Sequence, residues 1–207
     1  MKVLTINGSP HLHGCTDRAL LEVEKTLKEE GIEVVRINVG NKDIRGCIAC
    51  NFCRSHGHCV FNDLVNETAP VLDEVDGVIV GTPIYYAGSN GQLLAFLDRL
   101  FYSTSGVVDK TMKAAAAVVS SRRGGSTSAF DEINKYFTIC SMPIVSSTYW
   151  NEVHGFVAED VEKDLEGLQT MRNLGHNMAF MIRAISAQKE KAGLPAQERT
   201  AFTSFMD

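Results

Sequence analysis

The sequence predicts an α/β fold in which helices cover a parallel sheet of five strands. Strand-like apolar runs alternate with amphipathic helical stretches along the chain, and this alternation is typical of a parallel sheet built from crossover units. The run Asp76–Gly81 is apolar between its ends, as expected of a strand buried on both faces. At 207 residues the chain is long enough for one domain with a full core, or at most two small ones.

Composition and charge limit the classes of partner. The chain is 44% hydrophobic and 22% charged, which is common in globular soluble proteins. Its formal net charge of -5 disfavours a nucleic-acid-binding surface. No apolar run reaches the ~18–20 residues that cross a bilayer, and no signal peptide opens the sequence. We therefore expect a cytoplasmic protein that binds neither nucleic acid nor membrane.

The N-terminal stretch Lys2–Thr16 predicts a strand, a turn and the start of a helix. Val3–Ile6 suits a buried strand, and Asn7–Pro10 is a turn-forming cluster. From Thr16 to Glu30 apolar residues recur at helical spacing, and Gly31 ends the helix. A small-residue loop between strand and helix offers free backbone N–H groups and the positive end of the helix dipole. We expect this loop to hold a phosphate.

The rest of the chain continues the alternation. The predicted elements that follow are the strand Ile32–Val39, the cysteine-bearing segment Gly40–Asp63, the helix Leu64–Glu74 interrupted by Pro70, the strand Asp76–Gly81, the loop Thr82–Gly91 and the helix Gln92–Ser103. After these come the small-residue strand Lys113–Ser120, the loop Ser121–Gly125, the helix Ser126–Thr138, the last strand Met142–Trp150, the long helix Asp160–Ile185 and a polar tail, Ser186–Asp207. The alanines of the fourth strand would by themselves also allow a helix.

Three loops follow the first, third and fourth predicted strands. They are Gly8–Thr16, Thr82–Gly91 and Ser121–Gly125, and all are rich in Gly, Ser, Thr or Pro. Because ligands bind outside the carboxyl ends of parallel strands, we expect these loops to meet at one edge of the sheet. The first loop lacks both the Gly-Lys-Ser/Thr ending of a Walker loop and a GxGxxG fingerprint, which disfavours ATP hydrolysis and a Rossmann-type NAD site.

The segments GSPHLHGCT, GTPIYYAGSNGQLLAFLDR and SSRRGG occur in these loops in this order. Together they resemble the flavodoxin-like NAD(P)H-dependent flavin reductases, and with the cysteine run the chain is most similar to the iron–sulfur flavoprotein branch. The resemblance implies a flavodoxin-like three-layer sandwich with strand order 2-1-3-4-5, a bound FMN, and a homodimer or homotetramer. It implies an FMN-binding domain over residues 1–187, with a cysteine-rich insertion at 41–63 and a C-terminal tail at 188–207.

Carried over by position, the resemblance also implies the residues that bind FMN. The phosphate would be surrounded by Ser9, Pro10, His11, Gly14, Cys15 and Thr16. The isoalloxazine ring would be lined by Thr82, Pro83, Ile84, Tyr85, Tyr86 and Gly88. Its pyrimidine side would lie along Ser120, Arg122, Arg123, Gly124 and Gly125. The chain departs from the family at His11, where a basic residue is common, and at Cys15, where Asn or Ser is common.

Each loop also has a plainer interpretation. The first could be an ordinary strand-to-helix turn capped by Thr16. The apolar run Pro83–Tyr86 suits the flat face of a flavin, but it could equally pack in a subunit interface. The arginines at 122 and 123 would favour a reduced, anionic flavin, or they form a solvated basic pair. His154, at the same edge, could meet a substrate or serve a structural role.

Four of the six cysteines, Cys47, Cys50, Cys53 and Cys59, form a C-x2-C-x2-C-x5-C run. The first three are spaced as in ferredoxin-type ligation, which favours a 4Fe-4S cluster. Zinc with a histidine ligand and a loop without metal remain alternatives. A disulfide framework is disfavoured in a cytoplasmic protein, and the two other cysteines suit packing.

From the resemblance we expect an FMN-dependent oxidoreductase. It would pass electrons from NAD(P)H, or from ferredoxin through a cluster, to a small acceptor such as a quinone, free flavin, oxygen or peroxide. We name no catalytic residue, because the chemistry belongs to the cofactor. The alternatives are a flavodoxin-type electron carrier without turnover and a flavin sensor that uses the cysteines as a redox switch.

Overall fold

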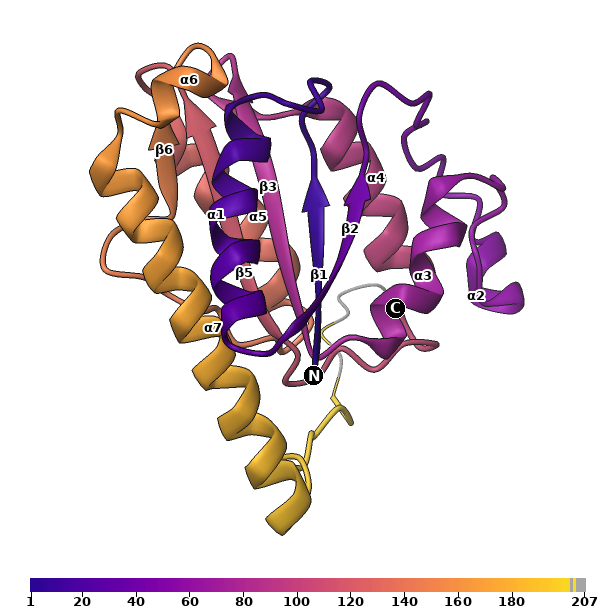
Figure 1. The fold of residues 1–207 in the computed structure, drawn as a ribbon. Coiled ribbons are helices and arrows are strands. Elements are labelled where there is room, and N and C mark those ends of the chain that lie inside the picture. The colour runs from indigo at the N-terminus through magenta and orange to yellow at the C-terminus, as the bar shows by residue number, and fades with distance from the viewer. Residues whose placement is uncertain (202, 204–207) are drawn as a thin grey trace.

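The computed structural model describes residues 1–201 and 203, and Figure 1 shows its three layers. Five parallel strands lie side by side in the order β2-β1-β3-β5-β6. Their bounds are β1 Lys2–Asn7, β2 Glu33–Asn38, β3 Gly77–Tyr85, β5 Ala114–Ser121 and β6 Glu152–His154. A short strand, β4 (Gly88–Ser89), pairs antiparallel with β3. The predicted α/β fold and the order 2-1-3-4-5 are confirmed, because β5 and β6 are the fourth and fifth parallel strands along the chain.

Helices cover both faces of this sheet (Figure 1). One face carries α1 (Cys15–Glu29) and α7 (Leu165–Ala192), and the other carries α3 (Leu64–Glu74), α4 (Gly91–Ser103) and α5 (Ser126–Thr138). Two short helices lie at the edges: α2 (Phe52–His56) in the cysteine-rich insertion and α6 (Ala158–Val161) near the carboxyl ends of the strands. Within the described residues, no helix has the length and apolar character of a membrane span.

The small residues of β5 are explained by its place in the middle of the sheet. Every residue of β5 is buried. Ala114 and Ala116 face the core under α1 and α7, whereas Ala115 and Ala117 face the core under α3, α4 and α5, because successive side chains of a strand point to opposite faces. Gly81 of β3 likewise lets a helix pack closely on the sheet, because a Cβ there would lie 2.8 Å from Leu20 Cδ1 of α1.

The segment predicted as the loop Thr82–Gly91 is a β-hairpin. Strand β3 continues to Tyr85, and β4 returns beside it. The two turn residues, Tyr86 and Ala87, have positive φ angles of 49° and 62°. Two consecutive left-handed residues make the tight turn that fits the twist of a hairpin, although Gly or Asn are the usual residues there. The hairpin therefore stands at the carboxyl end of the central strand.

The predicted last strand, Met142–Trp150, is wrong. The paired strand is β6, and within 142–150 only Ile144 forms an isolated bridge, with Ala115. The polar groups of this segment bond to α7: Ser147 Oγ donates to the Thr170 carbonyl at 2.7 Å. In the same way, Asn177 Nδ2 donates to the Ser146 carbonyl at 2.8 Å. The Val, Thr and Tyr content suited a strand, but the segment pairs with β5 only around Ile144 and bonds to α7 further along.

The predicted helix Asp160–Ile185 is interrupted, and it ends later than expected. It is divided into α6 and α7, and Asp164 begins the second part by accepting a hydrogen bond from the Gly167 N–H at 2.9 Å. Helix α7 then continues past residue 188 to Ala192, where Gly193 with φ 76° ends it. The first residues assigned to the tail 188–207 are thus helical, and residues 202 and 204–207 lie outside the described part.

Candidate functional site

A cleft of about 630 Å³ opens at the carboxyl ends of the strands. The loops after β1, β3, β5 and β6 all contribute to it, and α6 borders it at the upper end of Figure 1. The predicted site residues that line it are Ser9, His11, Gly14, Cys15, Thr16, Pro83, Ile84, Tyr85, Ser120 and Arg122. The structure thus brings parts of all three predicted loops together around one cavity. The predicted residues that do not line it are Pro10, Thr82, Tyr86, Gly88, Arg123, Gly124 and Gly125.

The first loop presents the open N-terminus of α1 to the cleft. Gly14 is the N-cap residue, and no side chain caps the first turn of the helix. Ser9 shapes the loop: its N–H donates to Asn7 Oδ1 at 3.0 Å, and its hydroxyl accepts from the His11 N–H at 3.1 Å. The hydroxyl proton of Ser9 is therefore free to point toward an anion. Uncapped N–H groups and a hydroxyl donor are the features that bind phosphate at a helix N-terminus.

Cys15 and Thr16 follow at the start of α1. The Thr16 hydroxyl lies 2.8 Å from the Ser120 hydroxyl, and both residues are buried, so this contact joins the first loop to the end of β5. Burial raises the pKa of the Cys15 thiol, and the carboxylates of Asp160 and Glu159 add to this effect. The thiol is therefore neutral at neutral pH and does not repel a phosphate.

The second loop forms one wall of the cleft through Pro83, Ile84 and Tyr85. Burial raises the pKa of the Tyr85 phenol, which therefore stays neutral. Thr82 has a structural role, because its fully buried hydroxyl accepts from the Asn90 N–H at 3.1 Å and donates to the Pro83 carbonyl at 3.0 Å. Tyr86 projects from the hairpin turn and is fully exposed.

The third loop places a cation beside the cleft. The guanidinium carbon of Arg122 lies 5.7 Å from the centre of the Phe156 ring, and within the described part of the chain no salt bridge involves Arg122 or Arg123. Gly125 supports the hairpin, because a Cβ there would lie 2.6 Å from Ala87 Cα. This loop therefore contributes one lining arginine, and its glycine fixes the position of the aromatic wall.

The sequence analysis missed the loop after β6. Residues 155–159 line the cleft, with Phe156 and Val157 strongly exposed, and His13 lines it as well. The predicted last strand ended at Trp150, whereas Gly155 directly follows the observed strand β6, so the misplaced strand hid this loop. His154, which we did consider, does not line the cleft; its N–H donates to Asp164 Oδ2 at 2.7 Å.

The cysteine-rich insertion forms a second, separate pocket. Cys47, Cys50, Cys53 and Cys59 all line it, together with apolar side chains and Arg99 of α4. The two short turns of the motif contain Ala49 and Asn51, with positive φ angles of 52° and 57°. Among the described residues, no three Cys, His, Asp or Glu side chains converge on a point that could hold one metal ion. The fold thus brings the four cysteines to one pocket without arranging three of them around a single point.

Comparison with known proteins agrees with this architecture. Residues 1–156 match the family model of the NADPH-dependent FMN reductases. An iron-sulfur flavoprotein of Methanocaldococcus jannaschii is 35% identical over 191 residues, covering 89% of this chain and 99% of the relative. A second one from the same organism is 33% identical over 207 residues, covering 94% and 100%.

A solved structure shows the same fold. The flavodoxin, WrbA-like protein from Agrobacterium tumefaciens superposes with a TM-score of 0.61 at 16% identity, covering 88% of this chain and 98% of that one. This likeness confirms the predicted flavodoxin-like fold.

Proposed function

The chain belongs to the NADPH-dependent FMN reductase family and is an FMN-dependent oxidoreductase, and from this premise we propose which donors and acceptors it uses. It takes electrons from NAD(P)H or from a ferredoxin and passes them to a small acceptor such as a quinone, free flavin, oxygen or peroxide. The observation that carries the proposal is the cleft, where the uncapped N-terminus of α1, the wall formed by Pro83–Tyr85 and the guanidinium of Arg122 meet. Bound FMN can accept a hydride or single electrons.

The chain's own residues would bind and orient this cofactor. The N–H groups of the first turn of α1 and the Ser9 hydroxyl would hold the phosphate. Ile84 and Tyr85 would cover the ring, since apolar side chains suit its face. Arg122 would supply positive charge near the cleft and thereby favour the reduced, anionic flavin. The exposed face of the ring would remain open to a donor or acceptor.

We further propose that the four cysteines Cys47, Cys50, Cys53 and Cys59 hold a 4Fe-4S cluster. Four thiols around one largely apolar pocket are the donor set of such a cluster. Left-handed backbone at non-glycine residues costs energy and persists mainly at functional sites, which supports the proposal for the turns at Ala49 and Asn51. A cluster supplies one-electron exchange, as a ferredoxin donor requires.

The pair of exposed aromatic side chains near the cleft, Tyr86 and Phe156, supports a homodimer or homotetramer. Large exposed aromatics commonly pack in interfaces. Static light scattering that gives the mass of one 22.7 kDa chain would contradict this oligomer.

Anaerobic purification followed by spectroscopy tests the proposed function. We expect flavin absorbance bands on a broad iron–sulfur shoulder, and about four iron and four sulfide per chain. NADPH, NADH and a reduced ferredoxin are then added separately, with a quinone or oxygen as acceptor. Bleaching of the flavin and turnover by at least one donor support the reductase. If no donor reduces the flavin catalytically, a flavodoxin-type carrier is the better explanation.

Two cysteine variants test cluster binding separately from FMN binding. Cys53→Ser removes one thiol of the pocket, so we expect loss of most iron and sulfide with FMN binding retained, measured by metal analysis and flavin fluorescence. Cys140→Ser is the matched control, because Cys140 lies outside the cysteine pocket. Equal iron content in the two variants would show that the proposed ligands are wrong.

A further inference from the structure

A buried guanidinium lies directly against the cysteine pocket. Arg99 of α4 is 1% exposed and is among the largest fully buried side chains. Its Nε and Nη2 donate to the Cys59 sulfur at 3.3 and 3.2 Å. Its other edge faces Asp63, with Nη1 to Oδ2 at 2.7 Å and Nη2 to Oδ1 at 2.9 Å. A planar arginine fork thus joins a sulfur on one edge to a carboxylate on the other.

The position of Arg99 is fixed by several further contacts. Backbone carbonyls of Arg45 and Phe61 accept from the guanidinium, both at 3.3 Å, and the Phe61 ring stacks against it at 5.0 Å. Asp63 is itself held, because it caps α3 by accepting from the Val65 N–H at 3.1 Å. These contacts hold the guanidinium so that it is aimed at the Cys59 sulfur.

Of the four cysteines, Cys59 accepts hydrogen bonds from a guanidinium. In the described part of the chain, no arginine or lysine donates to the sulfur of Cys47, Cys50 or Cys53. Reduction of an iron–sulfur cluster adds negative charge to its sulfurs. Hydrogen bonds and positive charge near a ligand sulfur stabilise the reduced state and raise the reduction potential. The effect is strong where the donor is buried, because water does not screen it.

We propose that Arg99 is a positioning residue that orients the Cys59 sulfur and raises the midpoint potential of the cluster. This inference rests on the proposed cluster. The Asp63 carboxylate, on the far edge of the guanidinium, partly offsets the charge and sets how large the rise is. The function of the pair is therefore to set how readily the cluster takes an electron relative to the flavin, which would bind in the separate cleft at the ends of the strands.

An anaerobic redox titration tests this inference, with the cluster followed by electron paramagnetic resonance and the FMN by absorbance. In Arg99→Gln we expect the one-electron equilibrium to shift about tenfold against the reduced cluster, which equals about 59 mV. Arg99→Lys keeps one charged donor and should recover part of the shift. The FMN potential, measured in the same samples, should not change, which separates tuning from general damage.

The outcomes are distinct. Wild-type protein without iron would defeat both the cluster and the inference. An iron-replete Arg99→Gln protein with the wild-type potential would overturn the inference alone. If Arg99→Gln fails to fold or to hold iron, Asp63→Asn provides the second test, since it keeps the donor and removes the offsetting charge. The cluster potential should then rise, and an unchanged or lower value would overturn the inference.

Discussion

Gly124 and Gly125 are neighbours in the loop after β5, but the structure gives a conformational reason for only one of them. Gly125 has φ 98°, and a Cβ there would lie 2.6 Å from Ala87 Cα and 3.1 Å from Ile84 Cγ2. A Cβ on Gly124 would meet nothing within 4 Å. Gly125 therefore acts by letting the hairpin of β3 and β4 approach the third loop.

We predict that Gly125→Ala weakens FMN binding about tenfold, because a tenfold change corresponds to about 1.4 kcal/mol and left-handed strain alone costs of order 1–3 kcal/mol. The added methyl group would also push Ala87 and the aromatic wall away. Fluorescence titration of the apoprotein with FMN measures the effect. Gly124→Ala is the matched control and should bind FMN as the wild type does. Equal affinity of the two variants would contradict the packing argument.

At this scale, residues of continuous motifs such as Ser9, Thr16 and Tyr85 were predicted for the site, and the structure places them around one cleft. It could not predict contacts between distant positions. The Arg99–Cys59 hydrogen bond joins residues forty positions apart, and the contact of Arg122 with Phe156 joins two loops. Such pairs depend on how the elements pack, which no local spacing contains.

At the scale of elements, the bounds of α5 followed local signals, whereas those of the long C-terminal helix and of the last strand did not. Helix α5 has the predicted bounds Ser126–Thr138, since its amphipathic pattern and its preceding glycine lie within it. The segment Met142–Trp150 has strand propensity, yet it forms hydrogen bonds with α7. Asn177 of α7 donates to the Ser146 carbonyl, and Ser147 donates to the Thr170 carbonyl of α7. Strand propensity means that the side chains fit a pleated, half-buried surface. Whether the segment joins a sheet depends on which elements pack beside it in the fold.

The packing of α1 against α7 includes an ionic bridge at the buried carboxylate of Glu22. Glu22 of α1 accepts from Arg18 Nη1 at 2.9 Å and from Arg172 Nη1 of α7 at 2.5 Å. Burial alone would raise the pKa of Glu22, but the hydrogen bonds from Arg172 and Arg18 outweigh it and hold the pKa below its usual value. The folded protein therefore favours the ionised form.

We predict that Glu22→Gln lowers the free energy of unfolding at pH 7 by about 1.5–3 kcal/mol, the range for hydrogen bonds to charged groups. A carboxylate with a lowered folded pKa stabilises above its unfolded value of 4.5 and loses this contribution as pH falls through the folded value. The gap between wild type and variant should therefore shrink below about pH 4.5. Urea unfolding across pH measures it.

The exposed Glu29 of the same helix supplies the control for this measurement. Its carboxylate lies 4.0 Å from Lys25 Nζ at the surface, and exposed pairs contribute little. Glu29→Gln should leave stability unchanged within about 0.5 kcal/mol. A Glu22→Gln protein whose stability deficit is the same at pH 3 and pH 7 would contradict the assigned role.

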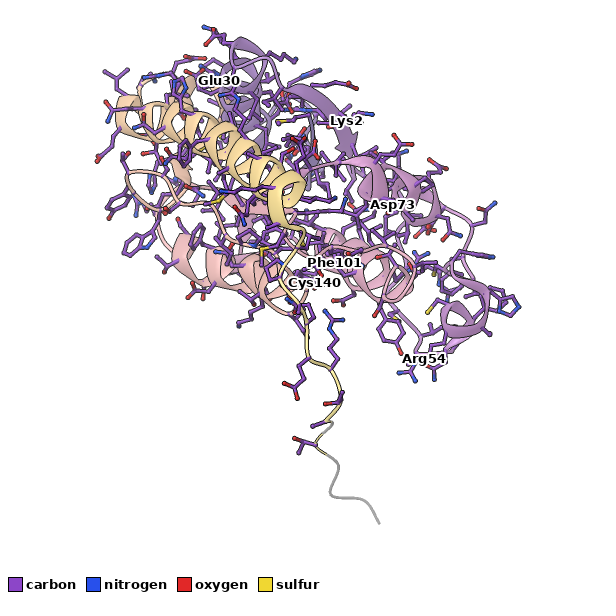
Figure 2. All side chains as sticks on the ribbon, turned by 90° about the horizontal axis from the view of Figure 1, so that it is seen from below. Lys2, Glu30, Arg54, Asp73, Phe101 and Cys140 are labelled. Carbon is purple, nitrogen blue, oxygen red and sulfur yellow. The ribbon has the colours of Figure 1, made fainter. Side chains whose placement is uncertain are left out.

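At the scale of the whole molecule, the alternation of strands and helices predicted a parallel sheet covered by helices. The strand order came from the family resemblance of the three loop motifs, and the structure confirms it. The chain carries a formal net charge of -5, yet the cysteine-rich insertion 41–63 carries three basic residues, Lys42, Arg45 and Arg54, against two acidic ones, Asp43 and Asp63. In Figure 2, Arg54 lies at the outer edge of the molecule, well away from α7.

This uneven charge predicts where an acidic ferredoxin would dock. Complementary charges speed association, and an exposed cation in the insertion would bring the partner close to the proposed cluster. We predict that Arg54→Glu slows reduction by a reduced ferredoxin about tenfold at low ionic strength, with the difference fading as salt rises. Stopped-flow absorbance measures the second-order rate constant.

The control is Lys28→Glu, which makes the same charge change at an exposed site in the last turn of α1. Because α1 covers the other face of the sheet (Figure 1), this variant should lower the ferredoxin rate only through the net charge, by much less than Arg54→Glu. Reduction by NADPH should be the same in both, because a nicotinamide would meet the flavin in its own cleft. If Lys28→Glu slows ferredoxin as much as Arg54→Glu does, the insertion is not the docking surface, and net charge alone governs the encounter.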